Sequence, residues 1–261
     1  MSILLKVKDQ YVDVYELPDP FTVSVILSIV NNEGITLYFK AKLVNPPSGY
    51  SNYEKTLGSV GAGASVMKAF SFDRSQPTLT NGELSETLTL RVEAYRDSGY
   101  TNLYDAVEKN FTINYLNRED PAFTKIIHNN FDDGTKQGWL SGSGGIFPKA
   151  AYNLNNVVSY HYYSPSYALK NYESDKHQYK SVDTSGYSKA FLIIHLFRES
   201  GYDSLLGIKV GNKVLLLPEE SEVLPYNTWC KLVFPLPIGS ITIKLGATSS
   251  TYVDDIIVAC K

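Results

Sequence analysis

Hydrophobic and polar residues alternate with a period of two along much of this chain. The clearest case is residues 86–95, where Leu88, Leu90, Val92 and Ala94 share one face and Thr, Arg and Glu residues share the other. Successive side chains of a β-strand point to opposite faces of its sheet. The pattern therefore predicts a strand with one buried and one solvated face, as in a two-sheet sandwich.

The rest of the first half supports the same interpretation. Residues 21–27 are a strand candidate that ends at a turn-forming Asn-Asn-Glu-Gly sequence, and residues 35–44 follow as its expected hairpin partner. Residues 110–115 make a last strand. Strands at this spacing, with no helical period between them, resemble immunoglobulin-like or fibronectin-like modules. We therefore expect residues 1–118 to form an immunoglobulin-like β-sandwich.

The second half has its own strand pattern. Residues 191–197 are apolar on both faces, which predicts a strand covered on both sides. A Gly-Asn pair at 211–212 predicts a two-residue hairpin turn, and residues 251–259 predict a closing strand. The short polar segment 119–122 contains a proline and is the expected linker. A second β-domain should then comprise residues 123–261.

Composition and charge agree with an all-β protein and exclude some functions. The 261 residues suffice for two domains, and 20 Tyr, 18 Gly and 12 Pro suit short strands joined by tight turns. The formal net charge of −3 provides no basic patch to replace phosphate counterions. No apolar run approaches the ~20 residues needed to span a bilayer. We expect neither a nucleic-acid partner nor a membrane span.

The N-terminal residues show no signal peptide. They alternate like a strand and lack the apolar stretch of about 7–15 residues that such a peptide needs. We therefore expect either that a signal was trimmed or that the protein leaves its cell by another route, for example by virion assembly and lysis.

Three short motifs in the second half suggest a family. They are NFDDGTKQGW at 130–139, SPSYALK at 164–170 and YVDDIIV at 252–258. In this order they resemble the opening, middle and closing motifs of β-jelly-roll carbohydrate-binding modules and their galactose-binding-like relatives. The resemblance implies that the second domain is a jelly roll and that Trp139 packs inside it.

The paired aspartates are candidate metal ligands. Asp254 and Asp255 interrupt an apolar strand, and a buried carboxylate needs hydrogen-bond donors or a cation. In the family that these motifs resemble, a structural calcium lies where the first and last strands meet, which implies Asp132 and Asp254 as ligands. In the alternative, Asp132 and Asp133 form a solvated turn and Asp254 accepts backbone hydrogen bonds. The residues leave both interpretations open.

Tyrosines cluster in the interval from residue 152 to residue 187. Sugar-binding surfaces use flat aromatic faces of this kind to stack on the C–H groups of the sugar. Within the expected strand 159–163, Tyr160 and Tyr162 share one face, and we expect them to bind a glycan or a protein partner. The alternative is that the cluster is structural, because tyrosine is a favoured strand residue with an apolar body and a polar tip.

No catalytic pattern stands out. Nucleophile elbows, HExxH and phosphate loops are missing, and a glycosidase would need a carboxylate pair in a cleft, which is not singled out. His195 shares a strand face with apolar residues, which predicts a hydrogen-bonded core histidine. Cys230 and Cys260 fit either two buried thiols or one disulfide. We therefore expect no enzyme.

Two functions compete. The first is a structural or attachment protein of an extracellular or virion surface assembly, with a lectin-like jelly roll that associates with itself or with other surface proteins. The second is a carbohydrate-binding module of a secreted or cell-surface protein. The absent signal peptide favours the first, and a glycoside hydrolase is the least supported alternative.

Overall fold

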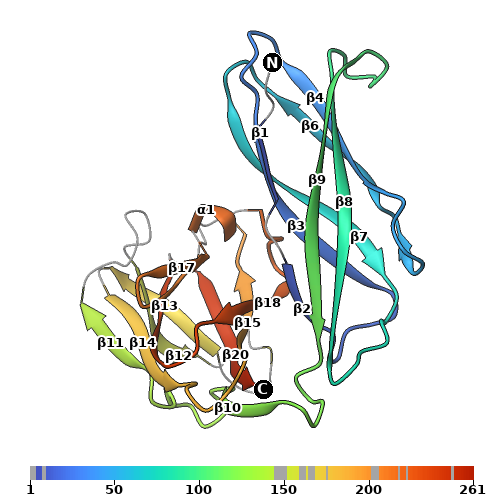
Figure 1. The fold of residues 1–261 in the computed structure, drawn as a ribbon. Helices are drawn as coiled ribbons and strands as arrows, with labels where there is room; N and C mark the ends of the chain where they lie inside the picture. Colours follow the sequence, from blue (N-terminus) through green and yellow to red (C-terminus); the bar gives the residue numbers. More distant parts are fainter. Residues whose placement is uncertain are drawn as a thin grey trace. The chain divides into compact units, whose positions relative to one another are not determined.

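The fold consists almost entirely of β-strands. The computed structural model describes residues 4–7, 10–143, 152–158, 163, 168–174, 176–200, 206–216, 218–221, 223–247 and 250–261. Within these ranges the regular elements are twenty strands and one four-residue helix, α1 (Pro218–Ser221). The chain divides into two compact units, Met1–Asn117 and Arg118–Lys261 (Figure 1). The expectation of an all-β protein with two β-sandwich domains is confirmed.

Unit 1 contains two sheets that enclose a common hydrophobic core. The first has the order β1 (Leu4–Val7), β3 (Phe21–Val30), β7 (Ser65–Arg74) and β5 (Tyr50–Ser51). The second has the order β2 (Gln10–Asp13), β9 (Leu103–Leu116), β8 (Glu83–Tyr95), β4 (Leu37–Val44) and β6 (Glu54–Val60). β2 runs parallel to β9, and the other described pairs in this unit are antiparallel.

The alternation in β8 predicts its buried face correctly, because Leu88, Leu90, Val92 and Ala94 are all buried. The expected hairpin between the segments that form β3 and β4 is wrong. β3 pairs with β1 and β7, whereas β4 pairs with β6 and β8 in the opposite sheet. The intervening turn carries the chain from one sheet to the other, and local sequence does not distinguish such a crossing from a hairpin.

Unit 2 also contains two sheets around one core. One has the order β12 (Tyr152–Val158), β13 (Ala168–Ser174), β20 (Thr251–Cys260), β15 (Ala190–Arg198) and β18 (Trp229–Leu236), and β10 (Thr124–Asn129) also pairs with β20. The other has the order β11 (Leu140–Ser143), β14 (Lys176–Asp183), β19 (Ser240–Ala247), β16 (Leu206–Val210) and β17 (Lys213–Leu216).

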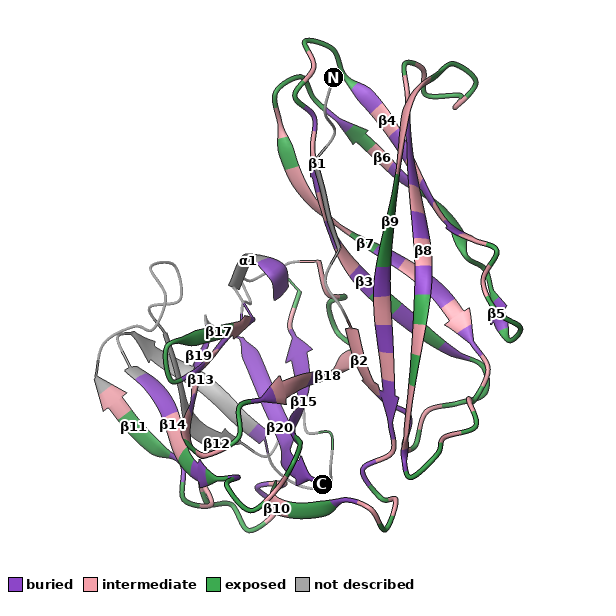
Figure 2. Cartoon of the chain, viewed as in Figure 1, coloured by how far each residue is buried: buried purple, intermediate pink, exposed green. Residues whose placement is uncertain are grey.

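Among the strands of unit 2 whose burial the structure describes, β20 and β15 are the most deeply buried. Every residue of both strands is buried, as Figure 2 shows by their continuous purple colour. This confirms the strand covered on both faces that residues 191–197 predict. The hairpin between β16 and β17 is also confirmed, with Gly211 at a φ of 56° in its turn. Cys230 and Cys260 are free thiols, and burial raises the pKa of each to about 11. Among the described residues, no helix is long and apolar enough to cross a membrane.

Limited proteolysis should cut the chain first between residues 117 and 121. Each unit encloses its own hydrophobic core, whereas Glu119 and Pro121 in this segment are exposed. We expect two resistant fragments, identified by mass spectrometry, that each keep a β-sheet circular dichroism spectrum. Early cuts between residues 180 and 215, with residues 117–121 still intact, would show that the boundary is misplaced.

Candidate functional site

The closing strand β20 carries a β-bulge at its paired aspartates. The register with β15 passes from Ile193 opposite Ile257 to His195 opposite Asp254, so β20 holds one extra residue here. Asp255 has a φ of 45°, in the left-handed region that aspartate tolerates better than most residues. Both Asp254 and Asp255 are buried, with 0% and 4% of their surface exposed. Two neighbouring buried carboxylates must therefore both find partners.

Asp255 lies between the side chains of His128 and Arg118. Its Oδ1 is 2.5 Å from His128 Nε2 on β10, and its Oδ2 is 3.6 Å from Nη2 of the buried Arg118. Burial alone would raise the pKa of Asp255, but the hydrogen bond with His128 and the charge of Arg118 lower it below the usual range. The ionised carboxylate therefore joins the beginning of unit 2 to its last strand.

His195 is a buried imidazole beside this carboxylate. It is 1% exposed, and its Nδ1 lies 3.5 Å from Asp255 Oδ2, but neither ring nitrogen makes a hydrogen bond. Burial lowers the pKa of His195 to about 3, against the opposing effect of Asp255, so the ring is neutral at ordinary pH. The expected core position of His195 is confirmed. The expected hydrogen bond is wrong, because neither buried ring nitrogen has a hydrogen-bond partner.

Asp254 holds a tyrosine above this histidine. Its Oδ2 accepts a 2.8 Å hydrogen bond from the backbone N–H of Tyr163, and its Oδ1 accepts one of 2.7 Å from the N–H of Asp255. The Tyr163 ring lies on the His195 ring, with centroids 3.7 Å apart and planes inclined by 15°. Tyr163 remains 39% exposed. A solvent-exposed aromatic ring is thus fixed by one backbone hydrogen bond and one buried ring.

Three further aromatic residues surround this pair. Trp229 on β18 presents its ring at 5.9 Å from that of Tyr163 and at 5.5 Å from that of Phe197. Phe197 lies opposite both Trp229 and Tyr252 in the sheet register, and its ring is 5.8 Å from that of Tyr252. We call Tyr163, His195, Phe197, Trp229 and Tyr252 the Tyr163 platform. Aromatic pairs of this kind stabilise one another beyond their buried area.

The opening motif is fixed by a separate hydrogen-bond network. The side-chain oxygen of Asn129 accepts bonds from Trp139 Nε1 (3.2 Å) and Lys180 Nζ (2.9 Å). Gln137 Oε1 accepts bonds from the Asn129 amide (3.1 Å) and from the backbone N–H of Phe131 (3.2 Å). Phe131 and Trp139 are buried in the core of unit 2. The core position predicted for Trp139 is confirmed.

The two predicted calcium ligands differ in their surroundings. Asp132 Oδ2 accepts a hydrogen bond from the Asn130 amide, whereas Asp132 Oδ1 is buried without a hydrogen-bond partner. A carboxylate oxygen of this kind is able to coordinate a cation. Both oxygens of Asp254 already accept N–H groups. The described part of the chain contains no group of three or more His, Cys, Asp or Glu side chains placed to hold a metal. Calcium at Asp132 and Asp254 stays a prediction.

The predicted ligand-binding residues Tyr160 and Tyr162 lie outside the described residues. The structure instead brings forward Tyr163, the next residue of the same tyrosine run, together with Trp229. The tyrosine-rich interval could have indicated Tyr163. Nothing in the sequence shows that Trp229 and His195 would join it, since their proximity depends on strand register.

No family model and no curated protein matches the chain. Solved structures resemble it weakly. The tandem family 22 carbohydrate-binding modules of Paenibacillus barcinonensis Xyn10C are 11% identical, with 98% of this chain and 93% of that chain covered and a TM-score of 0.38.

Two single modules are also similar. The C-terminal family 22 module of Clostridium thermocellum Xyn10B is 13% identical, covers 52% of this chain and 94% of that one, and has a TM-score of 0.37. The family 35 module of Cellvibrio japonicus Abf62 is 15% identical, covers 47% and 93%, and has a TM-score of 0.30. At these identities and TM-scores, the similarity gives no information about what this chain binds.

Asp255→Asn should lower the free energy of unfolding by about 3 kcal/mol at neutral pH, because it removes the buried carboxylate that lies beside Arg118 and His128. Asp133→Asn, in an exposed turn of the same unit, should change it by less than about 0.5 kcal/mol. Since the folded state lowers the pKa of Asp255, its contribution is present above the unfolded value of about 3.9 and is lost as pH falls through the folded value.

Urea denaturation of both variants at several pH values measures this difference. Equal stabilities of Asp255→Asn and wild type at pH 7 would contradict the assigned role.

The calcium prediction is tested by thermal melting with and without EDTA. A site of micromolar affinity should raise stability by about 4 kcal/mol at a thousandfold excess of ion, and Asp132→Asn should abolish that increase. Identical melting curves for wild type with calcium and with EDTA would end the claim.

Proposed function

We propose that unit 2 is a non-catalytic carbohydrate-binding module that acts at the Tyr163 platform. The observation that carries this proposal is the half-exposed Tyr163 ring stacked on the buried His195. Pyranose rings present C–H groups on their faces, and a flat aromatic ring packs against them with little loss of side-chain freedom. A tyrosine that is already held in place loses still less on binding.

Polar groups beside the platform can bond sugar hydroxyls. Lys231 lies opposite His195 in the register. It is two residues from Trp229 on β18, so the two side chains lie on the same face of the strand. Ligand sites combine an apolar or aromatic surface with a few such polar groups. Tyr160 and Tyr162, at the same end of the tyrosine run, are proposed to extend this surface.

Assembly is the second candidate function. Leu140 and Val214 are exposed apolar side chains on β11 and β17, which are the two edge strands of one sheet in unit 2. Exposed sheet edges with apolar side chains favour pairing with another chain. A subunit of an extracellular or virion surface assembly would use these edges, either with other copies or with other surface proteins.

We also infer that unit 1 is immunoglobulin-like. The order β1-β3-β7 corresponds to strands A-B-E of that fold, and β4-β8-β9 corresponds to C-F-G.

A glycan array with the full chain tests the carbohydrate proposal. Tyr163→Ala and Trp229→Ala should each weaken binding about two- to twelvefold, since stacking energies of about 0.5 to 1.5 kcal/mol correspond to such factors. Tyr53→Ala is the matched control, because Tyr53 is a tyrosine of similar exposure (37%) in unit 1. The double variant Tyr160→Ala with Tyr162→Ala should fold and also bind less.

Equal binding by Tyr163→Ala and wild type would remove the platform from the function. If wild type binds no glycan but has a multimeric mass by size-exclusion chromatography with light scattering, assembly replaces carbohydrate binding as the function.

A further inference from the structure

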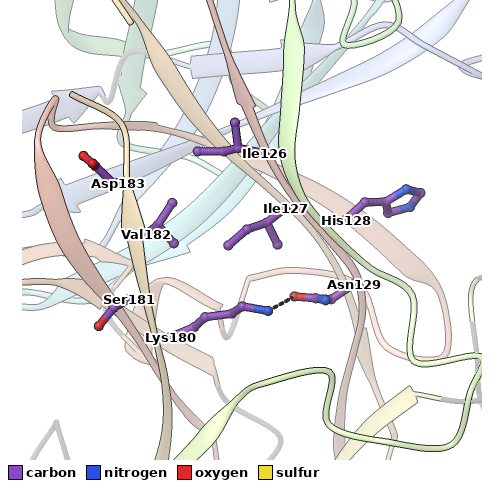
Figure 3. A pocket seen from close by; sticks show the side chains of 8 residues that line it. All are labelled: Ile126, Ile127, His128, Asn129, Lys180, Ser181, Val182 and Asp183. Carbon is purple, nitrogen blue, oxygen red and sulfur yellow. Dashed lines mark hydrogen bonds between the residues drawn. The ribbon is translucent and has the colours of Figure 1, made fainter. Parts of the chain in front are cut away.

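A concave site lies in unit 2, between β10 and β14. Its volume is about 430 Å³, within the usual range for small-molecule sites. Residues 126–129 of β10 and 180–183 of β14 line it (Figure 3). These strands belong to different sheets, so the pocket opens at an edge of the sandwich. None of these residues is part of the Tyr163 platform.

Lys180 brings a positive charge to one end of this pocket. Its ammonium donates to Asn129 Oδ1 (2.9 Å) and to the backbone oxygen of Gln137 (2.6 Å), and both acceptors are neutral. An ammonium has three donors, so these two bonds leave one for a further acceptor. Among the described residues, no carboxylate lies within ion-pair distance of Lys180.

Lys180 is half-buried, so its charge is partly withdrawn from water without a carboxylate beside it. Desolvation lowers the pKa of Lys180, which is the direction expected for a cation withdrawn from water without an anion. Asp183 also lines the pocket, but it lies at the far end from Lys180 (Figure 3), and its carboxylate accepts the N–H of Ser185 instead. A ligand carboxylate would supply the anion that the chain does not.

Three of the other lining residues are apolar, whereas His128, Asn129, Ser181 and Asp183 are polar. Ile126, Ile127 and Val182 face the space between the strands, whereas the His128 side chain points away from the others in Figure 3. A compact ligand with an apolar ring face and one carboxylate would match both parts. A uronic acid has this form, with its ring C–H groups on one side and its carboxylate on C5.

We propose that the pocket between β10 and β14 binds a carboxylate-bearing sugar, a uronic acid, through Lys180. The carboxylate would accept the third Lys180 donor and compensate its charge, and the sugar ring would pack on Ile127 and Val182. This site is separate from the Tyr163 platform, so the pocket can bind uronate even if the platform binds no glycan.

Methyl-resolved NMR of the full chain tests the proposal without any substitution. Titration with glucuronate should shift the methyl signals of Ile126, Ile127 and Val182 saturably, and equimolar glucose should not. Valerate, an aliphatic carboxylate without a sugar ring, distinguishes uronate recognition from binding of any small carboxylate. Shifts by valerate equal to those by glucuronate would overturn the assignment to a sugar, and absence of glucuronate shifts would overturn the site.

Lys180→Met then tests the residue. Glucuronate affinity should fall about tenfold or more, in line with the loss of a charge-assisted hydrogen bond. The matched control is Lys213→Met, at an exposed lysine of the same unit, which should bind as wild type does. Unchanged affinity in Lys180→Met would refute the role of Lys180. If Lys180→Met does not fold, the wild-type titration alone decides. Saturable shifts of the three methyl groups with glucuronate but not with glucose support the site, and absent glucuronate shifts overturn it.

Discussion

The structure of unit 2 depends on accommodating two adjacent carboxylates inside its central sheet. Asp254 and Asp255 could not both remain ionised among the apolar residues of β20 without partners, since an unpaired buried charge costs several kcal/mol. The bulge solves this by separating their environments. Asp254 accepts backbone N–H groups, and Asp255 meets Arg118 and His128. One extra residue in one strand thus determines where the beginning of the domain and the Tyr163 segment attach.

The opening and closing motifs stabilise each other because their strands are neighbours. β10 pairs with β20, with Asn129 opposite Ile256. Asn129 then organises the opening motif through Trp139, Gln137 and Lys180. The bonds between Asn129 and both Trp139 and Lys180 join segments that are 10 and 51 residues apart in sequence. The network therefore joins the loop of the opening motif both to β10 and to β14.

The sequence predicted local structure better than it predicted the site. Alternation of apolar and polar residues predicted β8, and a continuous apolar run predicted β15. Both predictions succeed because each face of a strand that is buried needs apolar residues at every second position. The pairing of β3 failed because hairpins and crossings between sheets begin with similar turns. The Tyr163 platform and the Lys180 pocket depend on contacts between distant strands. Residue type showed that tyrosines and buried aspartates needed partners, but it could not say which partners the register would supply.

The neutral state of His195 explains how the platform can be both exposed and rigid. Desolvation of the buried ring beneath Tyr163 disfavours the protonated imidazole. Burial keeps the pKa of His195 at about 3, so the imidazole is neutral and behaves as an aromatic surface at neutral pH, where the carboxylate of Asp255 is ionised. Two contacts thus position Tyr163: the backbone hydrogen bond to the buried Asp254 and the packing of its ring on His195. Both acceptor and ring are buried, so salt would screen these contacts little.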